Sequence, residues 1–320
     1  MKTIVHVTHE AVQKVGGIGA VLQGFFTSDA YNKGVERSIL VGPVMDLDGP
    51  AKTRLGKNGE VYYSSNDGID TGGWGEKFGP VQEAFGVGII YGRRVFTDRA
   101  TGVESKPEVI LIDVSNPNGG RLDAFKNTLL EKFGIQSNLY HTWEYEQYVR
   151  LAEPALDALR AIGVGADGEP AVILAHEFMG MPTALAAIAQ ENGWKTIFYA
   201  HEVATMRRIV EDHGGHDTMF YNVLAEAMPK GKFVEDVFGY QSPFFKHALV
   251  SAAKFCDAVF CVGDAVLDEM KFLGPAFADV PMSLVYNGLP AYEISVEEKV
   301  KSKKRLQKYC ENILELKPDH

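Results

Sequence analysis

The sequence predicts an α/β fold in which a doubly wound, parallel sheet carries helices on both of its faces. Short apolar runs alternate along the chain with segments whose apolar residues recur at every third or fourth position. The runs are continuous rather than alternating in polarity, which is typical of strands buried on both faces. Turn residues such as glycine and asparagine close several runs, as expected where strands and helices succeed one another.

The expected strands are four to nine residues long and are dominated by apolar side chains. They are residues 4–7, 38–43, 88–96, 108–114, 171–175, 195–200, 258–262 and 283–286. The last of them is stopped by Asn287 and Gly288, a pair that is typical of a turn.

The expected helices lie between these strands and share an apolar stripe at helical spacing. They are residues 19–26, 123–133, 144–162, 183–192, 244–255 and 265–272. Pro154 falls inside the third of them and is expected to kink it. Residues 45–79 are rich in glycine and show no periodicity, so we expect a long irregular insertion there.

The domain organisation follows from a change in composition near the end of the chain. Residues 1–290 are expected to form one Rossmann-like domain, and residues 291–320 a charged helical tail or interdomain linker. The tail carries only a thin apolar stripe of Val300, Leu306, Tyr309 and Ile313. Such a helix cannot complete a core by itself, so a solvated terminal helix and a linker to a further segment both stay open.

Composition limits the classes of function. The 320 residues carry a formal net charge of −10, which argues against nucleic-acid binding because such proteins are basic. No run of about 18 apolar residues predicts a membrane span. Two histidines and a glutamate among the first ten residues exclude a secretory signal peptide. Three cysteines make no disulfide framework, so we expect a reduced, cytoplasmic protein.

A glycine-rich loop, residues 14–19, follows the first strand and precedes the first helix. Lys14, Gly16 and Gly17 combine a point charge with a backbone that a ligand can approach closely. The N–H groups of the following helix favour an anion, so the loop is of the kind that binds phosphate. The dinucleotide pattern G-x-G-x-x-G fails, because Leu22 stands where its third glycine belongs. A strand-to-helix turn without a ligand is the alternative.

Two strands end in the same tripeptide, Ala-His-Glu, at His176-Glu177 and at His201-Glu202. Open α/β sheets bind ligands at the carboxyl ends of their strands, which is also where the glycine-rich loop lies. Histidine can hydrogen-bond a sugar hydroxyl or act as an acid or base. We therefore expect both histidines to face one site together with the loop.

Other chemistries lack their motifs. His176-Glu177 has no second histidine at position 180, so the H-E-x-x-H zinc motif is missing. His213 and His216 form an isolated H-x-x-H pair without a second pair of ligands, and we predict no metal site. No G-x-S-x-G sequence occurs, which leaves a serine hydrolase without support.

The ordered set of these segments resembles the glycogen and starch synthases. The loop at residues 14–18 looks like their K-x-G-G loop, and residues 175–180 look like their H-[DE]-W segment. Further segments that are similar to the family follow in the family's order: residues 92–113, 196–201, 258–270 and 285–289. The first of these is closer to the animal and fungal branch. The resemblance covers nearly the whole chain.

This resemblance implies a GT-B glycosyltransferase, of which the chain would be only the N-terminal, acceptor-side half. Glucose would pass with retention from ADP- or UDP-glucose to an α-1,4-glucan, with no cofactor besides the nucleotide-sugar substrate. Lys14, Gly16 and Gly17 would approach the donor diphosphate or its glucose, and His176 would be the catalytic contact to the transferred sugar. The remaining residues that the resemblance implies line the cleft: Glu177, His201, Asn287 and Gly288. The missing C-terminal domain would hold most donor contacts, so the isolated chain is expected to be inactive.

Two other functions remain open at this point. The first is a non-catalytic carbohydrate-binding or interaction module that uses the same cleft. The second, a nicotinamide-dependent oxidoreductase, needs an acidic residue after the second strand, and Asp46 and Asp48 are available there. The failed glycine spacing argues against it.

Overall fold

The computed structural model describes residues 2–98, 101–166, 168, 170–191, 193–212, 216–288 and 294–314. The chain divides into two compact units, Met1–Asn287 and Gly288–His320. The first unit holds the sheet and nearly all helices, and the second holds helix α12 (Val296–Leu314). The expected domain boundary after residue 290 falls among residues 289–293, outside the described residues, and stays a prediction.

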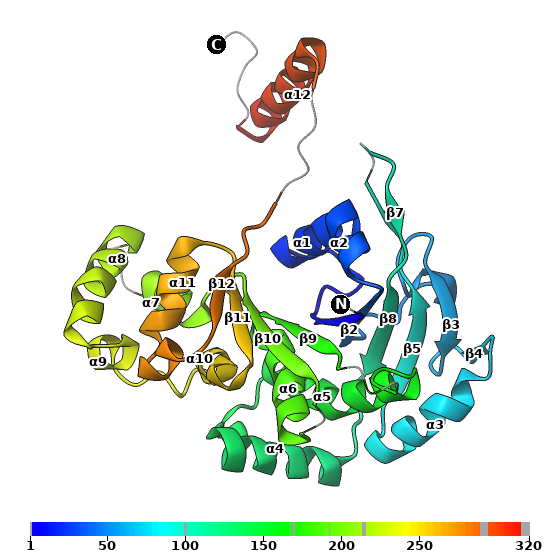
Figure 1. Ribbon diagram of the computed structural model, residues 1–320. Coiled ribbons are helices and arrows are strands. Elements are labelled where there is room, and N and C mark those ends of the chain that lie inside the picture. The colour runs from blue at the N-terminus through cyan, green and yellow to red at the C-terminus, as the bar shows by residue number, and fades with distance from the viewer. Residues whose placement is uncertain are drawn as a thin grey trace. The chain divides into compact units, whose positions relative to one another are not determined.

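A ten-stranded sheet runs through the described part of the first unit, in the order β12-β11-β10-β9-β1-β2-β8-β5-β3-β4 (Figure 1). Its parallel strands are β1 (Thr3–Val7), β2 (Arg37–Pro43), β8 (Glu108–Asp113), β9 (Val172–His176), β10 (Lys195–Ala200), β11 (Ala258–Cys261) and β12 (Met282–Leu284). The bounds of these strands agree with the expected ones to within a few residues. Continuous apolar runs are typical of strands that are buried on both faces, which is why the sequence identified them.

Helices cover both faces of the sheet, which confirms the predicted doubly wound, Rossmann-like α/β fold. Figure 1 shows α1 (Gly17–Phe26) and α2 (Asp29–Gly34) on one side of it. The other side carries α3 (Trp74–Phe85), α4 (Gly119–Phe133), α5 (Trp143–Ala161) and α6 (Glu177–Ala189). Helix α5 continues through Pro154 and buries most of its inner face against α6 and the sheet.

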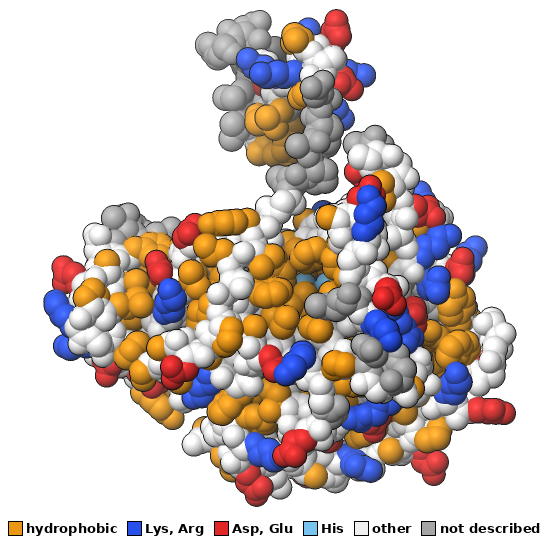
Figure 2. Space-filling model, in the orientation of Figure 1, with side chains coloured by type: hydrophobic (Ala, Val, Ile, Leu, Met, Phe, Trp, Pro, Cys, Tyr) orange, Lys and Arg blue, Asp and Glu red, His pale blue; other side chains and the backbone are white. Residues whose placement is uncertain are grey.

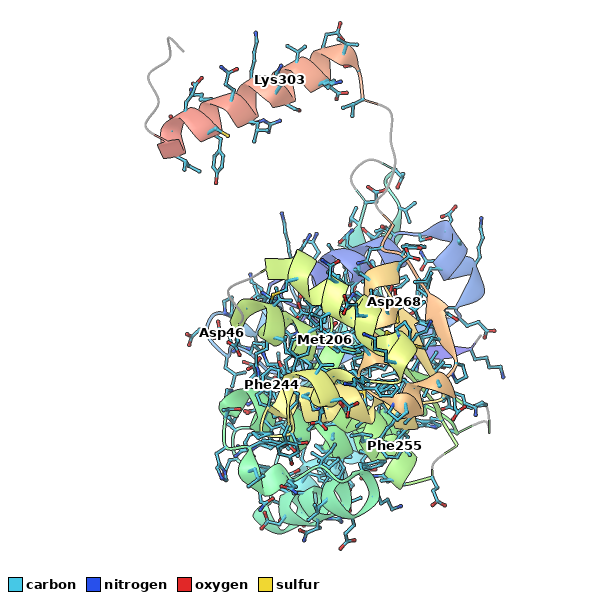
Figure 3. All side chains as sticks on the ribbon, turned by 90° about the vertical axis from the view of Figure 1, so that its left-hand side faces the viewer. Asp46, Met206, Phe244, Phe255, Asp268 and Lys303 are labelled. Carbon is cyan, nitrogen blue, oxygen red and sulfur yellow. The ribbon has the colours of Figure 1, made fainter. Side chains whose placement is uncertain are left out.

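The end of the sheet formed by β10 to β12 is covered by shorter helices. They are α7 (Ala204–Asp212), α8 (His216–Ala227), α9 (Val234–Phe238), α10 (Phe245–Ser251) and α11 (Asp264–Phe272). Figure 3 looks onto this end, where Met206 lies on α7, Phe244 directly before α10 and Asp268 on α11. Short 3-10 turns connect several elements: η1 (Ala51–Thr53), η2 (Ser137–Leu139), η3 (Met228–Lys230), η4 (Ala252–Phe255) and η5 (Pro275–Ala278).

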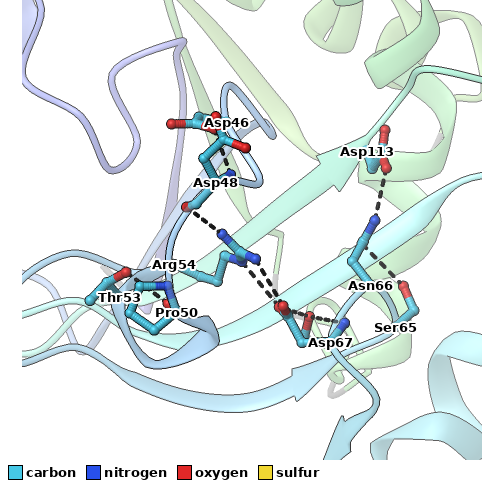
Figure 4. A network of polar contacts seen from close by, with 10 residues as sticks. Asp46, Asp48, Pro50, Thr53, Arg54, Ser65, Asn66, Asp67 and Asp113 are labelled. Carbon is cyan, nitrogen blue, oxygen red and sulfur yellow. Dashed lines mark hydrogen bonds and ion pairs between the residues drawn. The ribbon is translucent and has the colours of Figure 1, made fainter.

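The expectation of an irregular insertion at residues 45–79 was wrong. This segment forms β3 (Glu60–Ser64) and β4 (Ile69–Asp70) and leads into α3, and it extends the sheet through antiparallel pairing with β5 (Gly88–Arg93). Arg54 holds it together, because its guanidinium donates to both carboxylate oxygens of Asp67 at 2.9 and 3.1 Å and to the carbonyl of Asp48 (Figure 4). Contacts of this kind lie beyond the reach of local periodicity.

The expected strand at residues 88–96 is divided. Strand β5 ends at Arg93, and β6 (Phe96–Thr97) pairs instead with β7 (Glu104–Ser105) in a separate two-stranded sheet. The guanidinium of Arg94 lies between them and donates to the carbonyl oxygen of Ala11 at 2.8 Å. The break therefore ties this hairpin to the turn that follows β1.

Helix α6 begins six residues earlier than expected, at Glu177 rather than at residue 183. Gly180 and Pro182, residue types that are unfavourable in helices, both lie inside the helix. Gly180 is required by packing, since a Cβ there would lie 2.6 Å from Ala175 Cα and 2.8 Å from the carbonyl oxygen of Val7. The glycine lets α6 pack directly against β9 and β1.

The order of the strands creates a switch point between β1 and β9. The chain runs from β1 outward to β2 and β8, then returns to the other side of β1 as β9 and continues through β10 to β12. The segments after β1 and β9 leave toward opposite faces of the sheet (Figure 1). Such a divergence opens a crevice at the carboxyl ends of the two strands, where α/β proteins place their ligands.

The second unit contains α12, a charged helix that carries Lys303 (Figure 3). Its range, Val296–Leu314, confirms that the charged tail is helical within the described residues, while the choice between a solvated terminal helix and an interdomain linker stays a prediction. The expected stripe of Val300, Leu306, Tyr309 and Ile313 lies on this helix.

We predict that Gly180→Ala destabilises the fold by about 1–3 kcal/mol, because the added methyl group meets rigid backbone. Gly79→Ala is a matched control in helix α3, where a Cβ has no neighbour within 4 Å. That change should instead stabilise by about 0.5–1 kcal/mol. Urea unfolding followed by circular dichroism measures both, and an unchanged midpoint for Gly180→Ala would contradict the close approach of α6 to the sheet.

Candidate functional site at the carboxyl edge of the sheet

The candidate site lies where β1, β9 and β10 end. His9 and Glu10 follow β1, Glu177 follows His176 at the end of β9, and His201 follows β10. The structure brings most of the predicted residues together here: His176 bonds to His201 directly, and the charge of Glu10 acts on His201. Figure 2 shows a small area coloured as histidine in a hollow that hydrophobic side chains surround.

The glycine-rich loop already holds an anion of its own chain. The buried carboxylate of Glu10 accepts, at one oxygen (Oε2), the backbone N–H groups of Val15, Gly16 and Gly19 at 2.9, 2.9 and 3.0 Å. A carboxylate at the first turn of α1 is stabilised by the unpaired N–H groups and by the helix dipole. The expectation that a ligand phosphate meets these N–H groups is therefore corrected for Gly16, whose N–H group is occupied.

The surroundings that a side chain would meet differ among the three glycines of the loop. A Cβ on Gly16 would lie 3.2 Å from Glu10 Oε1, and a Cβ on Gly19 would lie 2.6 Å from Glu10 Oε2. Gly17 faces open space, with no atom within 4 Å of an added Cβ. Within the described part of the chain no hydrogen bond reaches the N–H groups of Gly17 and Ile18. Gly17 therefore remains the place where a ligand can approach the backbone.

Lys14 is exposed at the start of this loop. The aliphatic part of its side chain packs beside Gly19, since a Cβ there would lie 2.9 Å from Lys14 Cγ. The long stem leaves the ammonium group in solvent. Lys14 can thus bring a positive charge to the open side of the loop.

A continuous chain of hydrogen bonds crosses the site, and we call it the histidine relay: Ser38, Tyr31, His6, His176 and His201. His6 Nδ1 lies 3.0 Å from His176 Nε2, and His176 Nδ1 lies 2.9 Å from His201 Nε2. At the buried end, His6 Nε2 lies 2.8 Å from the Tyr31 hydroxyl, which lies 3.0 Å from Ser38 Oγ. Both ring nitrogens of His6 and of His176 have a partner, as burial requires.

Burial keeps the three histidines neutral. It lowers the pKa of His6 to about 3, and together with the neighbouring histidines it holds the pKa of His176 well below its ordinary value. Burial also lowers the pKa of His201 to about 4, although the charge of Glu10 opposes that shift. The relay therefore carries no net charge at neutral pH.

The direct sugar contact expected of His176 is corrected by this geometry. His176 is fully buried, and both of its ring nitrogens are engaged by other histidines. His201 is half-buried, and its Nδ1 has no hydrogen-bond partner among the described residues. His201, rather than His176, is the histidine that can bond a ligand.

Glu177 has the strained backbone that often accompanies a functional turn. Its φ of 58° lies in the left-handed region, which non-glycine residues seldom adopt. Its carboxylate Oε1 accepts the backbone N–H groups of His201 and Glu202 at 2.5 and 2.6 Å, while its buried Oε2 has no partner in the described part of the chain. Burial raises the pKa of Glu177 to about 8. Glu177 is therefore not a cleft-lining group; it fixes the backbone of His201.

Asn287 and Gly288 are both exposed. Asn287 closes the first unit, two residues beyond Val285, whose carbonyl oxygen accepts the Tyr199 hydroxyl at 3.2 Å. The Tyr199 ring in turn lies 4.3 Å from that of His201. Gly288 belongs to the second unit, and the cleft-lining role of both residues stays a prediction.

Sequence reasoning missed His6, Tyr31 and Tyr199. His6 had a visible signal, because it is a polar residue at the centre of an apolar strand that buries both faces. Tyr31 had none, since its hydroxyl reaches His6 from the short helix α2. Among the described residues, no group of three or more His, Cys, Asp or Glu is placed to hold a metal ion. His213 and the side chain of His216 lie outside the part of the chain that the structure describes.

No protein-family model matches the sequence, and no curated protein matches it. Solved structures of similar fold include one described as trehalose-6-phosphate from E. coli bound with UDP-2-fluoro glucose, at 10% identity and a TM-score of 0.41. The match covers 95% of this chain and 54% of that one.

Two further structures are similar to the same degree. An α,α-trehalose-phosphate synthase (UDP-forming) from Burkholderia xenovorans, in complex with glucose-6-phosphate, is 11% identical with a TM-score of 0.38, over 91% of this chain and 50% of that one. The N-terminal domain of a trehalose-6-phosphate phosphatase from Candida albicans is 11% identical with a TM-score of 0.41, over 95% and 54%.

The chain thus spans about half the length of these structures. Similarity of this size carries no information on substrate or activity. A search of the described helices for a stretch able to cross a membrane finds none.

We predict that Glu177 makes stability fall as pH rises. Its folded pKa of about 8 lies above the model-compound value of 4.5, so the folded state binds the proton more tightly. Its contribution is fully present below pH 4.5 and is lost as pH rises toward 8. Glu177→Gln keeps an acceptor for both N–H groups but cannot ionise. Between pH 5 and 8 the wild type should lose on the order of 3 kcal/mol relative to this variant in denaturant titrations. Parallel stability curves would contradict the prediction.

Proposed function

We propose that this chain is the N-terminal, acceptor-side domain of a retaining glucosyltransferase with GT-B architecture. It would take part in transferring glucose from ADP- or UDP-glucose to an α-1,4-glucan. One observation carries the proposal: three of the segments that resemble glycogen and starch synthases, residues 14–18, 175–180 and 196–201, end or begin at the carboxyl ends of β1, β9 and β10, which are adjacent in the sheet. Their two Ala-His-Glu strand ends are joined there by a hydrogen bond of 2.9 Å between His176 and His201.

The chemistry requires groups that stabilise a departing diphosphate and a developing positive charge on the sugar. Lys14 and the open N–H groups of Gly17 and Ile18 supply part of the first requirement. His201 Nδ1 supplies a hydrogen-bonding group for a sugar hydroxyl or a phosphate oxygen. The Glu10 carboxylate sits in the same loop and disfavours a second anion close to it. Most of the diphosphate contacts would therefore come from another domain.

The occupied loop also favours a second candidate, a non-catalytic carbohydrate-binding module. A loop whose first-turn N–H groups are partly satisfied by Glu10 has less to offer a diphosphate than an open one. Such a module would bind an oligosaccharide without the nucleotide. The two candidates differ in whether nucleotide-sugar binding depends on Lys14 and His201.

Two features of the structure argue against the oxidoreductase alternative. Leu22 is fully buried where a dinucleotide-binding helix has a glycine for close packing on the strand. Asp46 accepts the N–H group of Asp48 at 2.6 Å, and the carbonyl of Asp48 accepts from Arg54 (Figure 4). Both acidic residues thus belong to the polar network around Arg54.

We predict that UDP- or ADP-glucose binds to the chain and that Lys14→Ala and His201→Ala each weaken binding about tenfold, the loss expected for one hydrogen bond or ion pair. Lys57→Ala and His141→Ala are matched controls, because both residues are exposed and neither makes a hydrogen bond or ion pair with a site residue in the described part of the chain. Calorimetric titration with each nucleotide-sugar, a maltooligosaccharide and NADH measures the effect. Oligosaccharide binding that survives both site substitutions would favour the non-catalytic module, and tight NADH binding would overturn the proposal.

We also predict little or no transfer by residues 1–320 alone, because this chain supplies only part of the donor contacts. Extension of a glucan primer with labelled ADP- or UDP-glucose measures it. Activity comparable to that of a complete synthase would contradict the assignment of this chain as one half of the enzyme.

A further inference from the structure

The histidine relay has a consequence for the proton that His201 presents to the crevice. We propose that His6, His176 and His201 share a single tautomer, with the proton on Nδ1 in each, so that Tyr31 and Ser38 hold His201 as a hydrogen-bond donor. Tyr31, Ser38 and His6 would then be positioning residues that act on the ligand only through His201.

The shared tautomer follows from counting protons. A neutral imidazole carries one N–H donor and one acceptor nitrogen, and each contact between two rings needs one of each. If His6 carries its proton on Nδ1, then His176 Nε2 accepts and His176 must carry its own proton on Nδ1. That proton goes to His201 Nε2, which leaves the His201 proton on Nδ1. With the opposite choice, all three protons move to Nε2.

The buried end of the relay extends the same rule to two hydroxyl groups. In the first arrangement Tyr31 donates to His6 Nε2, and Ser38 donates to the Tyr31 oxygen. In the second arrangement His6 donates to Tyr31, and Tyr31 donates to Ser38. Since each hydroxyl has a single proton, a mixed arrangement leaves two donors or two acceptors facing each other in a buried site, which is costly.

The direction of the relay is set at its buried end. Nε2 of His201 faces His176, so Nδ1 is the nitrogen directed away from the relay. At the buried end, the Tyr31 hydroxyl lies 2.8 Å from His6 Nε2. A phenol hydroxyl is a better hydrogen-bond donor than acceptor, and an unprotonated imidazole nitrogen is a good acceptor, so this contact favours Tyr31 as the donor. This selects the arrangement in which every ring is protonated on Nδ1.

A donor at His201 also specifies how the proposed transferase would contact its ligand, and this statement about the ligand rests on the proposed function. A His201 N–H group would bond to an oxygen acceptor, such as a sugar hydroxyl or a phosphate oxygen, and would not remove a proton from it. His176 would transmit the choice of tautomer from the buried end without touching the ligand. The tautomers themselves depend only on the hydrogen bonds of this chain.

Long-range 1H–15N correlation spectra of the 15N-histidine-labelled chain, without ligand, test the inference directly. The protonated and unprotonated ring nitrogens of neutral imidazole have well separated 15N shifts, and His→Gln variants at positions 6, 176 and 201 assign the signals. We expect all three rings to be neutral at pH 7 and protonated on Nδ1. Different tautomers among the three rings, or protons on Nε2, would overturn the proposal.

Two hydroxyl deletions probe the direction of the relay. Tyr31→Phe removes the donor to His6, so the His201 ring signals should move toward a mixture of tautomers although Tyr31 does not contact His201. Ser38→Ala should leave all three rings on Nδ1, because Tyr31 can still donate to His6. A change of tautomer in Ser38→Ala would overturn the inferred direction. Tyr62→Phe is the matched control, since among the described residues the Tyr62 hydroxyl bonds only to Glu60, on the surface.

The spectra separate this inference from the proposed function. They are recorded without substrate, so a failure to bind nucleotide-sugar leaves the tautomer result intact. Conversely, mixed tautomers would overturn the relay while leaving the binding experiments with Lys14 and His201 unaffected. If Tyr31→Phe does not fold, the wild-type and Ser38→Ala spectra still decide between the two directions.

Discussion

The hydrogen bond between His6 and His176 joins β1 to β9, the two strands between which the strand order reverses. The geometry of the site depends on this bond. Parallel pairing places His6 opposite Leu174 and His176 opposite Tyr199, so the three histidines reach one another only in this register. A shift by one residue would turn their side chains to the other face of the sheet. It would also leave several buried ring nitrogens without partners, which is costly and favours the observed register.

Two buried glutamate side chains stabilise the loops on either side of this bond. Glu10 binds the N–H groups at the start of α1, and Glu177 binds those that follow β10. Both groups are buried and use backbone donors rather than cations, so each turns a flexible strand end into a fixed one. The crevice is therefore organised before any ligand arrives. The left-handed backbone of Glu177 is the strain that accompanies this arrangement.

The local patterns of the sequence were sufficient for the parallel strands, for most helices and for the edge of the sheet at which the site lies. They were insufficient for the segment at residues 45–79, because this segment is held together by the ion pair of Arg54 with Asp67, which are thirteen residues apart in the chain. They also placed the start of α6 too late, since Gly180 reads locally as a breaker and only its contact with Ala175 explains it. Periodicity reports burial of a face and says nothing of which partner covers it.

For the site, the sequence by itself determined which residue types gather at the carboxyl edge: the glycine-rich loop, two strand-end histidines and their glutamates. Strand continuity and turn chemistry are local properties, so they can be read along the chain. Only the tertiary structure decided that His176 is enclosed and His201 is accessible, that Glu10 occupies part of the loop, and that Tyr31 and Ser38 complete the relay. The enclosure of His176 by His6 depends on strand order and register across more than a hundred residues, and such pairings leave no trace in local sequence.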